Sequence, residues 1–171
     1  MIPQGRRLAL LAGSSTLGLA IANALGWSPR AAVAAEPGKF EVTHSDEEWR
    51  KLLTPSQYAV LRKEGTERPF TSPLNDEKRR GLFVCAGCAL PHFTSEMKFD
   101  SGTGWPSFFT SIPGHLATRQ DYLLIVPRTE YHCVRCGGHQ GHVFDDGPPP
   151  TGQRWCNNGV AQRFIPATGK A

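Results

Sequence analysis

Acidic side chains are absent from the first 35 residues: all fifteen Asp and Glu residues lie after that point. Three of the nineteen Lys and Arg residues, Arg6, Arg7 and Arg30, lie within the same stretch. The formal net charge of +4 therefore falls to +1 for residues 36–171, which carry sixteen basic and fifteen acidic side chains. A nucleic-acid-binding domain normally has a clear excess of positive charge. The near-neutral charge argues against nucleic acid as a partner.

A long, strongly apolar run is also missing. The segment from Leu8 to Leu25 is interrupted by Gly, Ser, Thr and Asn residues, whereas a transmembrane helix needs about 20 predominantly apolar residues. Arginines before this segment and the small residues at 31–35 after it have the layout of a secretory signal. We therefore expect residues 1–35 to be a signal peptide, with an uncleaved anchor as the alternative.

The expected destination is the periplasm of a bacterium with two membranes, with no stable membrane insertion once the signal is cleaved. The paired Arg6 and Arg7 fit a twin-arginine signal, and the general export route is the alternative.

Internal repeats and low-complexity tracts are missing as well, apart from three consecutive prolines at 148–150. The 136 residues from 36 to 171 suit one compact domain with its own core. We therefore expect a single catalytic or binding domain after the signal.

Helix signals are confined to the beginning of this domain. Ser45 and Glu48 have the spacing of a capping box, and Thr54 with Pro55 predicts a second helix start, with Gly65 as its stop. From residue 81 onward, apolar runs at 82–84, 122–126 and 131–134 alternate with turn residues, which predicts short strands. The expected fold is mainly β with short N-terminal helices.

Only five cysteines are present, and four of them form two Cys-x-x-Cys pairs, Cys85 with Cys88 and Cys133 with Cys136. Each pair can present two sulfurs from one tight turn, so that both pairs together complete a tetrahedral thiolate shell. Four thiolates leave no open position for substrate, which makes such a site structural. Zinc is the expected metal; iron in a rubredoxin-like shell and two disulfides are the alternatives. Because 44 residues separate Cys88 from Cys133, the metal would clamp two remote turns.

The fifth cysteine, Cys156, lies in the segment Arg154-Trp155-Cys156-Asn157-Asn158. In a strand, alternation places Arg154, Cys156 and Asn158 on one face and the other two residues on the opposite face. A nearby guanidinium favours the thiolate and makes Cys156 a candidate nucleophile. A buried, inert cysteine is the alternative.

Two histidines and a tryptophan are further candidates. His139 and His142 follow the second cysteine pair in a glycine-rich stretch, and histidine suits proton donation near neutral pH; an incidental pair of loop histidines is the alternative. Trp105, in Gly-Thr-Gly-Trp-Pro, belongs to a rigid turn that presents an aromatic face. Its indole either packs in the core or offers a site for a small apolar group such as a methyl.

Together and in this order, these segments resemble one family, the methionine-R-sulfoxide reductases of the B type (MsrB, or SelR-type). The resemblance covers residues 40–167. It rests on Thr66 to Phe70, both cysteine pairs, Lys98 to Phe108, His139 to Pro148, Pro150 to Gly152, and Arg154 to Asn158. It implies two antiparallel sheets and a structural zinc ion on the four paired cysteines, remote from the catalytic face.

The resemblance also implies an activity, the reduction of methionine-R-sulfoxide in peptides or proteins as a repair reaction. In that reaction the free cysteine is the nucleophile and becomes a sulfenic acid. The histidines shape and protonate the sulfoxide site, the indole packs the substrate methyl, and an arginine and an asparagine orient the nucleophile and polar partners. The residues implied here are Cys156, His142, His139, Trp105, Arg154 and Asn158.

A sixth cysteine is lacking. Many members of the family carry a resolving cysteine in the Ser-Gly-x-Gly-Trp-Pro segment, where this chain has Thr103. With four cysteines on the metal, no internal disulfide can regenerate Cys156. We therefore expect an external thiol reductant: a thioredoxin-like or glutaredoxin-like protein or a small thiol. Gln140 is a second departure from the family, and the sequence alone assigns it no functional consequence. The expected enzyme is a monomer.

Two other functions fit part of the pattern. A zinc-ribbon module that binds nucleic acid or protein would account for the cysteine pairs and leave the segment 154–158 without a role. A one-cysteine peroxidase would use Cys156 on hydrogen peroxide. Comparing consumption of peroxide with that of methionine sulfoxide separates the two enzymes.

Overall fold

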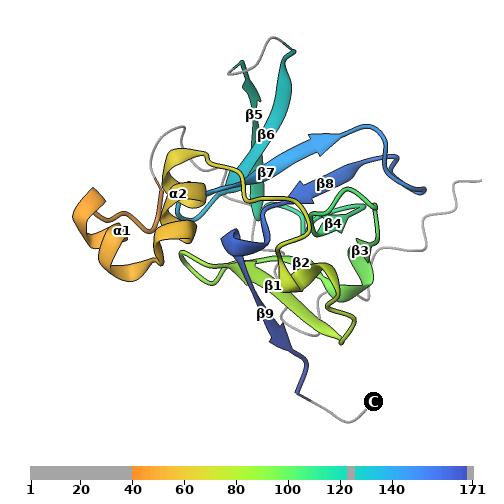
Figure 1. The fold of residues 1–171 in the computed structure, drawn as a ribbon, viewed down its shortest axis with the longest axis horizontal. Coiled ribbons are helices and arrows are strands. Elements are labelled where there is room, and N and C mark those ends of the chain that lie inside the picture. Colours follow the sequence, from red (N-terminus) through yellow and green to blue (C-terminus); the bar gives the residue numbers. More distant parts are fainter. Residues whose placement is uncertain (1–39, 123–125, 169–171) are drawn as a thin grey trace, which may run out of the picture. The chain divides into compact units, whose positions relative to one another are not determined.

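The computed structural model describes residues 40–122 and 126–168 (Figure 1). The predicted signal at residues 1–35 lies outside this part of the chain. Among the helices of the described residues, none has the length and apolar character needed to cross a membrane.

Two short helices precede the strands, as predicted. The first, α1, spans Asp46–Leu52 and the second, α2, spans Pro55–Lys63. Ser45 and Thr54 cap them, each in a complete capping box that satisfies backbone N–H groups of the first turn. The α2 helix ends at Glu64 in a left-handed conformation, one residue before the predicted stop. The N-terminal helices are therefore specified locally.

Two antiparallel sheets follow the helices in the described part of the chain, and three short 3₁₀ helices span Pro73–Asn75, Ser95–Met97 and Gly159–Ala161. One has three strands in the order β2-β1-β9, and the other has six in the order β3-β4-β8-β7-β6-β5. This arrangement confirms the mainly β fold with two sheets. The strands are β1 (Gly81–Cys85), β2 (Pro91–Thr94), β3 (Lys98–Phe99), β4 (Ser107–Phe108), β5 (Leu116–Asp121), β6 (Arg128–Cys133), β7 (His139–Phe144), β8 (Arg154–Asn157) and β9 (Gln162–Pro166).

Each Cys-x-x-Cys turn connects two neighbouring antiparallel strands. The first lies between β1 and β2 of the small sheet, and the second lies between β6 and β7 of the large sheet. A metal held by both turns therefore joins the two sheets, which explains why the pairs are so far apart in the sequence.

An aromatic core fills the space between the sheets. Phe83 and Phe93 come from the small sheet, Phe108 and Tyr131 from the large one, and all four are fully buried. The rings of Phe93 and Phe108 stack with their centroids 3.9 Å apart. Burying one such side chain contributes about 1.5–3 kcal/mol, so this cluster adds to the contacts that hold the two sheets together.

Of the apolar run at residues 122–126, which its composition predicted to be a strand, residues 123–125 lie outside the described part of the chain. Its described ends, Tyr122 and Val126, lie between β5 and β6 and are 73% and 71% exposed. The described strands are the polar segments on either side, which pair from Leu116 with Cys133 to Asp121 with Arg128. Cross-strand ion pairs of Asp121 with Arg128 and of Arg119 with Glu130 support this register. In Figure 1 this hairpin projects at the top.

Candidate active site and metal centre

The four paired cysteines meet at one point. Their sulfur atoms all lie within 4.8 Å of one another, with 3.6 Å between Cys85 and Cys136 and 3.4 Å between Cys88 and Cys133. A disulfide bond is about 2.05 Å long, whereas a tetrahedral shell with metal–sulfur bonds of about 2.3 Å has sulfur–sulfur edges of about 3.8 Å. None of the four forms a disulfide bond. The structure therefore favours a tetrahedral metal site over two disulfides.

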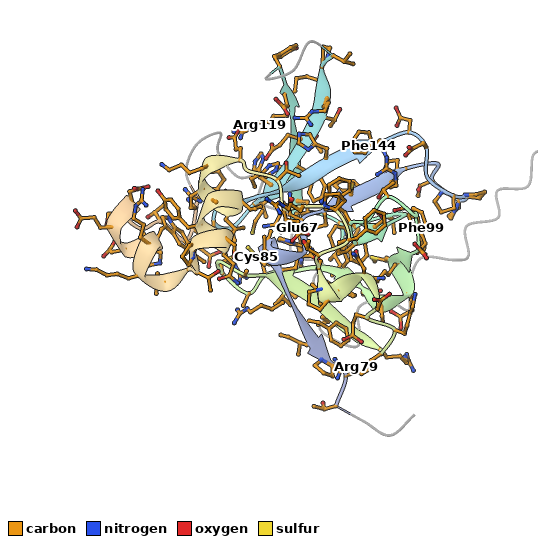
Figure 2. The ribbon with its side chains drawn as sticks, in the orientation of Figure 1. Glu67, Arg79, Cys85, Phe99, Arg119 and Phe144 are labelled. Carbon is orange, nitrogen blue, oxygen red and sulfur yellow. The ribbon has the colours of Figure 1, made fainter. Side chains whose placement is uncertain are left out.

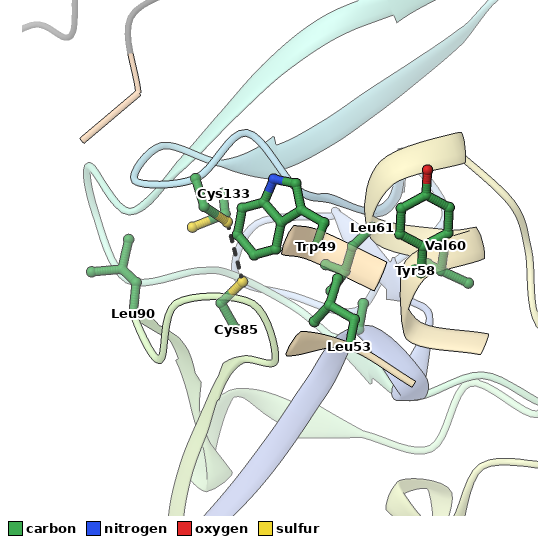
Figure 3. Packing of buried hydrophobic residues seen from close by; sticks show 10 residues of the cluster. Trp49, Leu53, Tyr58, Val60, Leu61, Cys85, Leu90 and Cys133 are labelled. Atoms are coloured by element: carbon green, nitrogen blue, oxygen red, sulfur yellow. Dashed lines mark hydrogen bonds between the residues drawn. The ribbon is translucent and has the colours of Figure 1, made fainter. Parts of the chain in front are cut away.

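The metal centre lies against the helices. Cys85, Cys133 and Cys136 belong to a buried cluster that includes Trp49 of α1 and Leu61 of α2. Figure 3 shows the Trp49 indole beside Cys85 and Cys133. Because thiolates in an apolar, dehydrated environment are costly without a compensating cation, this packing suits a site that is permanently filled.

Gln140 connects the metal centre to the rest of the large sheet. Its side-chain amide donates to the Cys85 sulfur at 3.5 Å. Its backbone carbonyl accepts from the backbone N–H of Asn158 at 2.8 Å and from the side-chain amide of Asn158 at 3.0 Å. Gln140, to which the sequence alone assigned no role, thus links Cys85 of the four-cysteine centre directly to Asn158.

Strand β8 presents two different faces, as the alternation predicted. The Trp155 ring packs 5.0 Å from the ring of Tyr131, and the Tyr131 hydroxyl donates to the Asn157 side chain at 2.8 Å, both on the core side. Arg154 and Cys156 lie on the opposite face. On the neighbouring strand β7, Gly141 pairs with Asn157. A Cβ added at Gly141 would lie 1.9 Å from the carbonyl oxygen of Cys156. Only glycine permits the two strands to pair here.

The pKa of the Cys156 thiol is raised rather than lowered, which corrects the expectation of a resting thiolate. Burial raises it, and this effect outweighs the opposing charge of Arg154 and the hydrogen bonds from Thr103 and Arg154. Arg154 is also engaged elsewhere, with two hydrogen bonds of 2.8 and 2.9 Å to the Asp146 carboxylate. Its field at the sulfur is therefore partly neutralised, and Cys156 rests as a thiol.

A small pocket of about 120 Å³ opens over Cys156. The predicted residues His142, Trp105 and Asn158 share its wall with the cysteine. The wall exposes more apolar than polar surface, and its glycine and aromatic residues leave room for one small group. The complete lining is Thr66, Trp105, Arg128, Gly141, His142, Phe144, Cys156, Asn157 and Asn158.

His142 is held by a carboxylate behind the pocket. Its Nε2 lies 2.7 Å from Asp121 Oδ2, and the same oxygen accepts from Arg128 at 2.6 Å. Because an aspartate oxygen is an acceptor, His142 carries a proton on Nε2 in either charge state. Burial lowers the pKa of His142, and although Asp121 opposes this effect, the charges of Arg128 and His139 add to it. The neutral imidazole is the resting form.

His139 lies behind the pocket rather than on its wall. Its Nδ1 is 2.7 Å from the buried Glu130 carboxylate, and its ring centroid is 5.4 Å from that of His142. Burial alone would raise the pKa of Glu130, but the hydrogen bonds to His132 and His139 outweigh it and hold the pKa at about 2. An ionised Glu130 fixes the orientation of the His139 ring, which in turn packs against His142.

The main-chain groups of Glu67 form hydrogen bonds with two residues that line the pocket. Its carbonyl oxygen accepts from the Trp105 indole at 3.1 Å, and its N–H donates to the Asn158 side chain at 3.0 Å. The Glu67 carboxylate accepts from the backbone N–H groups of Gly159 and Val160. Glu67 lies near the centre of the structure in Figure 2. Glu67 therefore fixes the positions of the Trp105 indole and the Asn158 side-chain amide.

The structure brings four of the six predicted site residues into the lining of one pocket and leaves the other two, His139 and Arg154, outside that lining. Sequence reasoning missed the acidic partners Asp121, Glu130 and Asp146 and the wall residue Arg128. One signal was present: Arg128 and Glu130 occupy alternate positions in the segment that leads into Cys133. Charged residues at alternating positions of a strand next to a buried turn indicate a buried ionic face.

Comparison with known proteins gives the family. Residues 53–166 match the SelR domain. The chain belongs to the SelR domain family. The resemblance found in the motifs is thereby confirmed, and Cys156 and the four paired cysteines all lie within the matched residues.

Its relatives are similar over most of their length. A protein of Agrobacterium fabrum named peptide methionine sulfoxide reductase MsrB is 51% identical over 127 residues, which cover 74% of this chain and 94% of the relative. A protein of the same name from Leifsonia xyli subsp. xyli is 49% identical over 134 residues, covering 77% and 96%. One from Methanosarcina barkeri is 50% identical over 124 residues, covering 72% and 87%.

Proposed function

We propose that this SelR domain reduces methionine-R-sulfoxide in peptides and proteins to methionine and so repairs oxidised proteins. The observation that carries the proposal is the 120 Å³ pocket whose lining brings together Cys156, His142 and Trp105. A pocket of this size accepts the end of a methionine sulfoxide side chain and excludes bulky groups. The names and high identity of the relatives support the same reaction.

The chemistry is an oxygen transfer from the substrate to the cysteine. Cys156 loses its proton to His142 and attacks the sulfoxide sulfur, while the protonated His142 delivers that proton to the sulfoxide oxygen. The S–S bond formed by the attack then breaks as the hydroxyl group passes from the substrate sulfur to the Cys156 sulfur. Methionine leaves with its sulfur reduced by two electrons, and Cys156 becomes a sulfenic acid. The indole of Trp105 packs against the substrate methyl group.

The remaining predicted residues orient these groups. Arg154, fixed by Asp146, lies beside the sulfur and favours negative charge on it during attack. Asn158 supplies polar groups at the wall, and His139 supports the ring of His142 from behind.

Regeneration of Cys156 requires a thiol from outside the chain. The sulfenic acid reacts with one external thiol to form a mixed disulfide and water, and a second thiol releases Cys156 and an external disulfide. Thr103, at the position of the family's resolving cysteine, hydrogen-bonds to Cys156 and cannot perform this step. A thioredoxin-like or glutaredoxin-like protein or a small thiol is the proposed reductant.

Zinc is the proposed occupant of the four-cysteine centre. The donor set and the sulfur spacing fit a closed tetrahedral site, which contributes to folding and takes no part in the reaction. The enzyme is further proposed to act as a monomer in the periplasm after export.

A single-turnover assay with separated sulfoxide epimers tests the function. With no added thiol, the R epimer is expected to yield one methionine per chain and a mass gain of one oxygen on Cys156, while the S epimer yields none. The readouts are chromatography of methionine and mass analysis of the Cys156 peptide. Equal consumption of hydrogen peroxide, or no methionine from either epimer, would contradict the proposal.

Asp121→Asn is expected to slow the reaction by lowering the pKa of His142 further. Between the lowered pKa of His142 and the raised pKa of Cys156, both groups are neutral. The reactive pair forms when one proton moves from Cys156 to His142, so its population falls about tenfold for each unit of pKa that His142 loses. The variant should lose kcat/KM on this plateau, and the acidic limb of its pH profile should move to lower pH.

Two measurements check this prediction: the pH profile of kcat/KM and an NMR titration of the His142 ring. Glu47→Gln removes an exposed carboxylate from α1 and serves as the control, with an unchanged profile. A slower Asp121→Asn enzyme whose acidic limb and His142 pKa stay in place would show that Asp121 acts only on structure.

A further inference from the structure

The catalytic pocket is too small to hold more than the end of one side chain. Its volume of about 120 Å³ is well below the roughly 300–1,000 Å³ typical of sites that enclose a whole ligand. A peptide whose methionine sulfoxide side chain enters this pocket must therefore lie outside it, on the surface around its mouth.

A second cavity adjoins the pocket on the other side of Trp105. It has a volume of about 340 Å³, and the Trp105 indole belongs to the lining of both cavities. Two aromatic side chains, Phe70 and Phe99, line it together with Lys98 and Asp100. In Figure 2, Phe144 at the wall of the pocket and Phe99 at the wall of this cavity both lie to the right of Glu67.

Phe70 is held at the edge of this cavity in an unusual state. Its side chain is 73% exposed, and its backbone adopts a left-handed conformation with φ 63°. The Phe70 N–H donates to the Gly104 carbonyl at 2.7 Å, and Asn75 donates to the same oxygen at 3.0 Å. A non-glycine residue in this region costs roughly 1–3 kcal/mol and persists only where its surroundings impose it. The strained backbone at Phe70 therefore lowers the stability of the loop, and the Phe70 ring is exposed to solvent next to the pocket.

We propose that this groove, lined by Phe70, Phe99, Asn75 and Lys98, binds the polypeptide segment on one side of the oxidised methionine. The inference rests on the proposed function, because the occupant is the substrate chain itself. Continuity through Trp105 supports it, since a chain leaving the pocket on that side enters the groove directly. The aromatic faces of the groove can cover apolar side chains of an extended segment.

The charges of the groove indicate which flanking residues it favours. Asp76 and Asp100 contribute two carboxylates, whereas the single ammonium of Lys98 is engaged with the Asn75 carbonyl at 2.7 Å. The groove is therefore net acidic and should favour substrates with Lys or Arg beside the methionine sulfoxide over substrates with Asp or Glu.

Steady-state kinetics with a graded set of substrates test the inference. N-acetyl-methionine sulfoxide amide serves as the minimal substrate, and it is compared with peptides extended by three residues at the N-terminal or C-terminal side. One extension is expected to raise kcat/KM, more so with lysine than with glutamate. In Phe70→Ala the ratio of kcat/KM for that peptide to kcat/KM for the minimal substrate should fall roughly tenfold. Phe99→Ala is a second variant with the same expected direction.

Leu52→Ala is the matched control, because Leu52 is a similarly exposed apolar side chain, 61% exposed, on α1. It should leave the ratio at the wild-type value. A wild-type enzyme that gains nothing from either extension, or a Phe70→Ala enzyme with an unaltered ratio, overturns the groove as a peptide site. A wild-type enzyme that reduces none of these substrates contradicts the proposed function instead, so the two failures are distinguishable.

Discussion

Cys156→Ser is expected to abolish methionine formation, with a loss of roughly 10⁴-fold or more in the single-turnover rate. A serine hydroxyl is a far weaker nucleophile than a thiol, and its oxygen cannot take up the sulfoxide oxygen as a sulfenic acid does. The structure offers no substitute, since the other four cysteines form the separate four-cysteine centre and none of them lines the pocket. The measurement is methionine released from the R epimer in a quenched single-turnover experiment.

The stability of the variant provides the control. Cys156 lies at the surface of a small pocket and is no part of either buried cluster, so Cys156→Ser should keep its metal content and melt at nearly the wild-type temperature. A stable variant that still forms methionine at the wild-type rate would exclude Cys156 as the nucleophile. With wild-type enzyme, methionine formation should stop at one equivalent until an external thiol is added, because the sequence holds no cysteine besides Cys156 and the four of the four-cysteine centre.

The features predictable from sequence are those that local spacing encodes. Capping boxes at Ser45 and Thr54 need only residues three positions apart, and both helices begin there. Each Cys-x-x-Cys turn forms within four residues. Period-two alternation around Cys156 separates the face of β8 that packs in the core from the face that carries Cys156. Each of these patterns is complete within a few residues, so that no knowledge of the rest of the chain is required.

The features that sequence did not provide depend on pairing between distant strands. Asp121 reaches His142 because β5, β6 and β7 are neighbours in one sheet, and Glu130 faces His142 across the β6–β7 ladder. Nothing local to Asp121 indicates that register. The pKa of Cys156 was misjudged for a related reason: a guanidinium two residues away is visible in the sequence, whereas burial and the Asp146 carboxylate that occupies Arg154 are not.

Removal of the metal should have the second large effect, loss of the cooperative fold. Structural zinc on four thiolates contributes apparent binding free energies of about 10–16 kcal/mol in small domains, comparable to or larger than the total stability of about 5–15 kcal/mol of a typical domain. Here the centre joins the β1–β2 turn to the β6–β7 turn and so connects the two sheets. Cys133→Ser should therefore be purified without stoichiometric metal and melt at least roughly 15 °C lower, or without a cooperative transition.

The route from the centre to the pocket predicts how activity fails in such a variant. The Cys85 sulfur accepts a hydrogen bond from the Gln140 side-chain amide. The Gln140 backbone carbonyl in turn accepts hydrogen bonds from the backbone N–H and the side-chain amide of Asn158. Loosening the centre should thus displace Asn158 and reduce single-turnover activity at temperatures where part of the protein is still folded. Metal analysis, a circular-dichroism melt and the R-epimer assay are measured together, with Cys156→Ser as the variant that loses activity and keeps metal. A Cys133→Ser protein that binds one zinc per chain and melts at the wild-type temperature would contradict a structural metal centre. A wild-type protein without metal whose mass lacks four hydrogens would contradict it equally, because that mass identifies two disulfides.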